Sequence, residues 1–148
     1  MSRTSVPPND QADRFARARE VQAVALLEDY VEMIGDLIAE LGEARVADIA
    51  QRMGVAQPTA TKAVARLKRE GLATSRPYRG VFLTADGAML ADRVRARHRT
   101  VVQLLTAVGV PEETAELDAE GIEHHVSEET LKAFEAFLAT RRGDERRR

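Results

Sequence analysis

Two short helical patterns separated by a glycine turn constrain the fold of this chain more than any other stretch. Residues 46–53 repeat apolar side chains at helical spacing, and Gly54 follows them at a turn. Residues 57–70 repeat the pattern. Pro58 suits the first turn of a helix, where its missing N–H is not needed, and Gly71 is a typical residue after a helix C-terminus. The stretch therefore predicts a helix-turn-helix.

A basic hairpin is predicted directly after the second helix. Residues 72–75 and 81–83 are typical of short strands, and Pro77 and Gly80 between them favour a turn. A helix-turn-helix followed by such a hairpin is a winged helix, which binds either DNA or another protein. The arginines at the hairpin tip favour DNA, because they neutralise phosphates. The candidate DNA-binding residues are Gln57, Pro58, Thr59, Thr61, Lys62, Arg66 and Arg79.

Charge is distributed unevenly along a chain whose net charge is only −2. Residues 43–100 carry 12 Lys and Arg against 5 Asp and Glu, a net charge of +7. Residues 110–139 carry 1 basic and 9 acidic residues, a net charge of −8. A basic segment of this kind suits a polyanionic partner, whereas the acidic segment must serve another purpose.

The remainder of the chain predicts helices around an aliphatic core, because only 4% of the 148 residues are aromatic. Helical patterns cover residues 13–40, 85–108, 111–125 and 127–140. We predict a mainly α fold, in which an N-terminal winged helix-turn-helix DNA-binding domain precedes a C-terminal helical dimerisation domain. Large apolar side chains in the second domain favour a homodimer, and these are Leu104, Leu105, Phe134 and Phe137.

The composition argues against several classes of protein. The chain has no cysteine, which disfavours a disulfide scaffold, a thiolate zinc site and a cysteine nucleophile. No run of about 18 apolar residues is present, so no membrane span is predicted. Residues 1–13 lack the apolar run of a signal peptide. We expect a cytoplasmic protein with no membrane partner.

Acidic and histidine side chains recur in three separate places. The C-terminal group has the spacing i, i+3 and i+4, so its side chains leave a predicted helix on one face. Carboxylate oxygens and imidazole nitrogens are ligands for hard to borderline divalent metals. Taken alone, each group is more typical of a solvated helix face or of packing. The groups are Asp29 with Glu32, His98, and Glu120 with Glu123 and His124.

Five stretches, each weak alone, are specific together. They are Glu28-Asp29-Tyr30-Val31-Glu32, Ala44-Arg45-Val46-Ala47-Asp48-Ile49-Ala50, Tyr78-Arg79-Gly80-Val81-Phe82-Leu83-Thr84, Arg97-His98, and Glu120-Gly121-Ile122-Glu123-His124-His125. With them, the chain resembles the manganese-responsive branch of the DtxR-like metalloregulators. The resemblance covers most of the chain, from Leu26 to Phe137.

The resemblance implies a manganese centre and a regulatory role. It implies two Mn(II) ions per subunit with at least one bridging carboxylate. The implied regulatory role is repression of metal-uptake genes, with activation of efflux genes in some relatives. The resemblance also implies a homodimer on a palindromic double-stranded DNA operator. His125 has no ligand role in this pattern and is interpreted as structural. The implied ligands are Asp29, Glu32, His98, Glu120, Glu123 and His124.

The predicted organisation has four parts. They are an N-terminal extension of residues 1–24, a winged-helix domain of residues 25–90, a metal-binding and dimerisation domain of residues 91–142, and a charged tail of residues 143–148. The extension is longer than in some members of the family and is expected to lengthen the first helix.

Three alternatives remain open. The first is an iron-responsive regulator of the same family, although that branch has Met and Cys where this chain has Asp29 and Glu123. The second is a di-metal carboxylate enzyme, which would use a pair of Glu-x-x-His motifs that this chain lacks. The third is a winged-helix regulator that senses an organic ligand without metal. We expect a regulator and not an enzyme.

Overall fold

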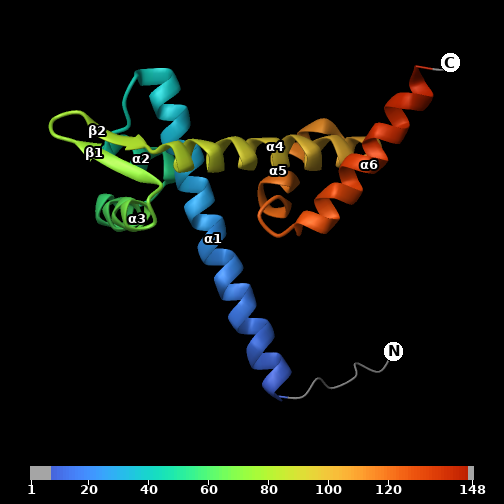
Figure 1. Cartoon of the computed structure of the whole chain (residues 1–148), viewed down its shortest axis with the longest axis horizontal. Helices are drawn as coiled ribbons and strands as arrows, with labels where there is room; N and C mark the ends of the chain where they lie inside the picture. Colours follow the sequence, from blue (N-terminus) through green and yellow to red (C-terminus); the bar gives the residue numbers. More distant parts are fainter. Residues whose placement is uncertain (1–7, 147–148) are drawn as a thin grey trace.

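The computed structural model describes residues 8–146, and its N-terminal half is a winged helix (Figure 1). A long first helix is followed by two shorter ones and by an antiparallel hairpin. The predicted helix-turn-helix and wing are therefore confirmed. The elements are α1 (Pro8–Leu41), α2 (Val46–Met53), α3 (Gln57–Arg69), β1 (Ala73–Arg76) and β2 (Gly80–Leu83).

Three helices form the C-terminal half, namely α4 (Ala85–Ala107), α5 (Glu112–Ile122) and α6 (Glu128–Glu145). Helix α4 runs through both halves: it packs against α1 and β2 near its start and against α5 and α6 farther along (Figure 1). The predicted domain boundary between residues 90 and 91 thus falls inside α4 and stays a prediction.

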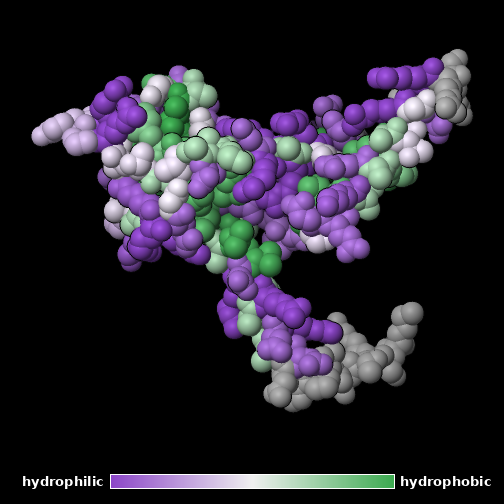
Figure 2. Space-filling model, viewed as in Figure 1, coloured by the Kyte–Doolittle hydropathy of each residue, from purple (hydrophilic) through white to green (hydrophobic). Residues whose placement is uncertain are grey.

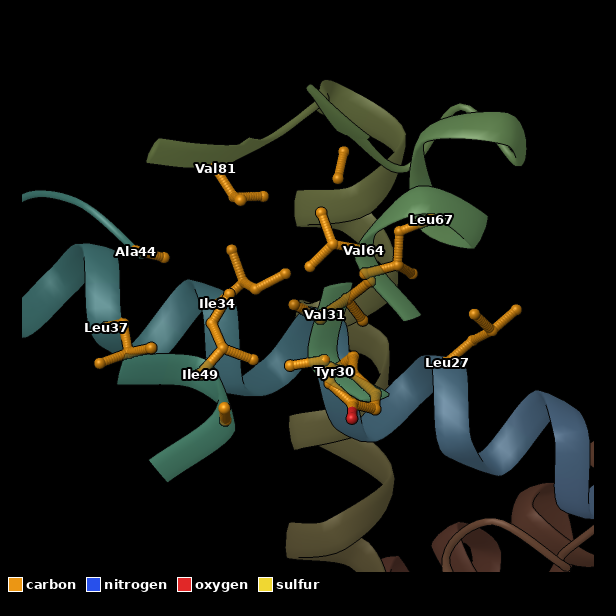
Figure 3. Packing of buried hydrophobic residues seen from close by; sticks show 14 residues of the cluster. Leu27, Tyr30, Val31, Ile34, Leu37, Ala44, Ile49, Val64, Leu67 and Val81 are labelled. Carbon is orange, nitrogen blue, oxygen red and sulfur yellow. The ribbon is translucent and has the colours of Figure 1, made fainter. Parts of the chain in front are cut away.

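The core of the winged helix lies where α1 meets α2, α3 and the hairpin (Figure 3). Helical spacing in the sequence predicts an apolar stripe on α1, formed by Leu27, Val31, Ile34, Ile38 and Leu41. Val31 and Ile34 are fully buried, whereas Leu41 at the end of the helix is 59% exposed. Tyr30 and Leu37 widen the buried face of α1 beyond that stripe. Burial of each such side chain stabilises the fold by about 1.5–3 kcal/mol, so this cluster fixes α1 on the DNA-binding half.

Gly80 allows the wing to approach the loop before α2. Its φ of 89° lies in the region that side chains disfavour. A Cβ atom at this position would come within 2.6 Å of the Ala44 carbonyl oxygen. The next residue, Val81, donates its N–H to that same oxygen at 2.8 Å. The hairpin is therefore tied to the start of the helix-turn-helix at a point where only glycine fits.

Three helix ends differ from the sequence predictions by more than one residue. Helix α1 begins at Pro8 rather than residue 13. The sequence predicts disorder for residues 1–8; this is wrong at Pro8, and residues 1–7 lie outside the described residues. Helix α6 continues to Glu145 instead of ending near residue 140. A single glycine costs a helix only about 1 kcal/mol, so Gly143 does not end α6, and the predicted tail is helical over residues 143–145.

Helix α5 ends at Ile122, three residues before the predicted end. Gly121 weakens its last turn, and Nδ1 of His125 lies 2.9 Å from the Gly121 carbonyl oxygen. Ser127 then begins α6, because its hydroxyl accepts the backbone N–H of Thr130.

The surface is mostly hydrophilic in the view of Figure 2, with hydrophobic residues over the winged helix and along α6. The C-terminal part of α4 together with α5 and α6 forms the helical lobe. In this lobe the side chains of Val108, Leu117 and Phe137 are 64%, 72% and 44% exposed. Such apolar exposure suits a second copy of the chain. Among the helices of residues 8–146, none has the length and apolar character needed to cross a membrane.

Candidate metal centre

Side chains from α1, α4 and the end of α5 meet in one region of the molecule. Helix α1 contributes a carboxylate pair, α4 contributes one imidazole, and the C-terminal part of α5 with the turn after it contributes the others. Every residue of the predicted ligand set lies in this region; the six are Asp29, Glu32, His98, Glu120, Glu123 and His124. Their role as ligands stays a prediction.

His98 on α4 lies beside two carboxylates. Its Nδ1 is 2.6 Å from Oε2 of Glu123 and 3.7 Å from Oε1 of Glu120. One ligand atom from each of these three residues can be chosen so that all lie within 4.8 Å of one another. Two carboxylates and one imidazole at this spacing form a suitable donor set for a divalent cation such as Mn(II).

His124 forms a second group with Asp29 and with the other oxygen of the Glu123 carboxylate. Its Nε2 lies 2.7 Å from Oδ1 of Asp29 and 3.4 Å from Oε1 of Glu123. The Glu123 residue is only 1% exposed, and its two oxygens face different imidazoles. Glu123 therefore joins the His98 group to the His124 group.

The fit of a metal to these residues is supported by His124 itself. Its side chain is 5% exposed. Neither ring nitrogen has a hydrogen bond of good geometry within the described residues, despite the nearby Asp29 carboxylate. A buried polar atom without a hydrogen bond costs about 1–3 kcal/mol. A cation bound here would satisfy a nitrogen that the protein leaves without such a bond.

A cavity of about 590 Å³ opens beside the centre, and its charged lining residues are Asp29, Glu32, Asp36, Arg52 and Glu120. Burial, followed by the neighbouring Glu120 and Asp36 carboxylates, raises the pKa of Glu32 above its ordinary value. The α1 side of the centre therefore presents several carboxylates, which favours a cation over a neutral ligand.

Burial also raises the pKa of Glu123 from 4.5 to about 7. The Asp29 carboxylate raises the pKa of His124. Burial alone would lower the pKa of His98, but Glu116 and Glu123 together raise it. Without a metal, the centre therefore retains protons near neutral pH, and these protons must leave when a cation binds.

Three further residues support the centre and were not predicted to do so. Glu28 is buried at 3% exposure and pairs with Arg97 on α4, and its Oε1 lies 3.9 Å from Nδ1 of His124. Glu116 lies 2.6 Å from Nε2 of His98. Its spacing of four residues before Glu120 on α5 was the signal that could have revealed it.

The predicted DNA-binding residues lie on the outer face of α3 and at the tip of the wing. The inner face of α3 buries Ala60, Val64 and Leu67 in the core. Arg66 is half-buried and its Nε is 3.9 Å from Glu70, so it is less available than the others. The other predicted DNA-binding residues are exposed, and these are Gln57, Pro58, Thr59, Thr61, Lys62 and Arg79.

Both halves of the chain match one known family. Residues 23–81 match the N-terminal DNA binding domain of iron dependent repressors. Residues 84–147 match the metal binding and dimerisation domain of the same repressors. Only residues 82 and 83, just before α4, lie between the two matches.

Individual relatives extend this similarity over most of the chain. The transcriptional regulator MntR of Escherichia coli O157:H7 is 51% identical, over 89% of this chain and 85% of its own length. The HTH-type transcriptional regulator MntR of Geobacillus kaustophilus is 39% identical, over 82% and 86% of the two chains. The solved structure of the manganese regulator SloR superposes with a TM-score of 0.65 at 30% identity, over 76% of this chain and 53% of SloR.

Proposed function

This chain belongs to the iron-dependent repressor family, and we propose that it is a transcriptional regulator that binds its DNA operator when manganese fills the centre described above. The named relatives are transcriptional regulators called MntR, and a similar solved structure is that of the manganese regulator SloR, which favours manganese over the iron-responsive alternative. The protein is a DNA-binding regulator and not an enzyme.

The observation that carries this proposal is the convergence of carboxylates and imidazoles from both halves of the chain. Asp29 and Glu32 belong to α1, which is packed into the winged helix. Glu120, Glu123 and His124 belong to the α5 end of the helical lobe. A site divided in this way couples cation binding to the arrangement of the DNA-binding half.

Without a cation, the Glu32 carboxylate on α1 and the Glu120 carboxylate on α5 repel one another across the two halves. At an effective dielectric constant of about 20, two like charges roughly 4 Å apart repel by about 4 kcal/mol before screening. When bound, a divalent cation supplies positive charge that offsets this repulsion. Asp29 and Glu32 then hold α1 against the lobe. Since the coupling is reciprocal, DNA binding must raise metal affinity by the same factor.

Two ions per subunit are proposed because Glu123 offers a different oxygen to each imidazole. Oε2 faces His98 at 2.6 Å and Oε1 faces His124 at 3.4 Å. Glu120 also lies near His98, and Asp29 also lies near His124. This supports two neighbouring positions that share the Glu123 carboxylate. Because Zn(II) has the higher raw affinity, selectivity needs a further difference, and we propose that Mn(II) fills both positions whereas Zn(II) fills one.

The proposed DNA target is a palindromic operator bound by a homodimer. The C-terminal family match includes dimerisation, and the lobe exposes Leu117 and Phe137. A two-fold dimer presents two copies of α3, and successive major grooves are about 34 Å apart. Repression of metal uptake is the proposed outcome, with activation of efflux as a second regulatory effect.

Fluorescence anisotropy tests the proposal directly. A labelled candidate operator is mixed with metal-free protein, and Mn(II), Fe(II) and Zn(II) are titrated in separate experiments. We expect Mn(II) to produce tight binding, and Zn(II) to bind the protein with a lower stoichiometry and weaker activation. Operator binding that is independent of metal would instead support a regulator that senses an organic ligand.

A further inference from the structure

The imidazole of His98 has carboxylates on both edges, and one of them lies outside the predicted ligand set. Nδ1 faces Glu123 at 2.6 Å and Glu120 at 3.7 Å. Nε2, on the other edge of the ring, lies 2.6 Å from Oε2 of Glu116. Glu116 and Glu120 are one helical turn apart on α5, so the same helix presents a carboxylate to each ring nitrogen.

We propose that Glu116 is a positioning residue for the metal centre, which accepts the Nε2–H of His98 and thereby directs the Nδ1 lone pair toward Glu120 and Glu123. This inference rests on the proposed function, because it assigns Glu116 a task in metal binding. It adds a carboxylate that supports the centre without coordinating the ion.

The chemistry of imidazole gives such a partner a definite task. A neutral ring carries one N–H and one lone pair, and the hydrogen bond made by one nitrogen decides which nitrogen is free to bind a metal. A carboxylate on the N–H side fixes the ring orientation and makes the opposite nitrogen more basic. His98 comes from α4, and without Glu116 its ring could turn away from the α5 carboxylates.

The position of Glu116 separates this role from a purely structural one. Its side chain is 53% exposed and approaches His98 from the solvent side. Removing it therefore leaves no cavity in the core and should not unfold the helical lobe. The backbone beneath it is anchored by Ala115 and Ala119, which are fully buried on the inner face of α5.

Manganese affinity of the full chain tests the proposal. We expect Glu116→Ala to weaken Mn(II) binding by roughly tenfold, the lower end of the effect for outer carboxylates. Glu116→Gln should restore most of the affinity, because its amide oxygen still accepts the Nε2–H. Glu113→Ala is the matched control, since it removes the same charge from an exposed site one turn earlier on α5.

Nitrogen NMR of histidine-labelled protein gives a second readout. In the cadmium-bound wild type, Nδ1 of His98 should couple to the metal, and Nε2 should carry a slowly exchanging proton. In Glu116→Ala that proton should exchange faster. Coupling of cadmium to Nε2, or equal manganese affinity in the wild type and Glu116→Ala, would overturn the inference alone. A wild type that binds no manganese would overturn the proposed function as well.

Discussion

Oδ1 of Asp29 lies 2.7 Å from Nε2 of His124, and this contact joins the winged helix to the turn after α5. Asp29 stands on α1, one position from the buried Tyr30 of the DNA-binding core. His124 stands on the lobe that matches a metal binding and dimerisation domain. The candidate centre therefore lies at a contact between the two halves.

Removal of one proposed ligand should abolish the metal response without unfolding the protein. Glu120 is suitable, because its side chain is 64% exposed and contributes little to packing. We expect Glu120→Ala to lose Mn(II)-dependent operator binding in anisotropy while its circular dichroism spectrum stays unchanged. Asp118→Ala, on the same helix, should respond as the wild type does. A full manganese response in Glu120→Ala would contradict the assignment.

Manganese affinity should rise with pH between about 6 and 8, because bound protons compete with the ion. Burial raises the pKa of Glu123 to about 7, and the pKa values of His98 and His124 are raised as well. Calorimetry in buffers of different ionisation enthalpy would measure the protons released on binding. An affinity that does not change with pH over this range would show that these groups are not displaced by the metal.

The stability of the metal-free protein should change with pH in the opposite direction. Glu123 binds its proton more tightly in the folded chain, where its pKa is about 7, than in the unfolded chain, where it is 4.5. Its contribution is therefore fully present at acid pH and is lost as the pH rises through about 7. The raised pKa values of the histidines act with the same sign. Thermal unfolding of chelator-treated protein across this range checks the direction.

The exposed face of α3 should bind phosphate through Lys62. We expect Lys62→Ala to weaken operator binding and to reduce the slope of log affinity against log salt by about 1, since each neutralised phosphate releases about 0.9 counterion. Lys132→Ala removes the same charge from the exposed surface of α6 and serves as the control. An unchanged slope in Lys62→Ala would place that residue away from the DNA.

Substitution of Gly80 should destabilise the wing. In Gly80→Ala the new methyl group would lie 2.6 Å from the Ala44 carbonyl oxygen, at a φ of 89°. We expect a loss of at least about 1 kcal/mol in the free energy of unfolding, measured with denaturant. Gly143→Ala is the contrasting variant, because its site in α6 is open and helical. It should leave stability unchanged or raise it by up to about 1 kcal/mol.

Local rules explain why the winged helix could be predicted closely. Gly54 and Gly71 end α2 and α3 with φ values of 66° and 74°, and Thr84 caps α4 by accepting the N–H of Gly87. These signals are short-range and are decided by backbone sterics. They fixed the bounds of α2 without error and those of α3 and α4 within one residue.

The metal centre could be predicted only in part from the residues themselves. Helical spacing links Asp29 to Glu32, but no periodicity places residue 29 beside residue 124; the family resemblance was needed for that step. The end of α5 was predicted wrongly, because Glu123, His124 and His125 are compatible with a helix when read alone. Their turn is set by the start of α6 at Ser127 and by contacts of the imidazoles with distant carboxylates.

The passage of α4 through both halves limits how this protein can be divided. Ala91 belongs to the buried cluster of the winged helix, whereas Val101, ten residues later, is buried in the helical lobe. A fragment that stopped at the predicted boundary would lose Ala91 from the first hydrophobic cluster. A chimera with a relative would keep both hydrophobic cores intact only if all of α4 came from one parent. The two halves of this protein therefore share one helix and cannot be exchanged independently.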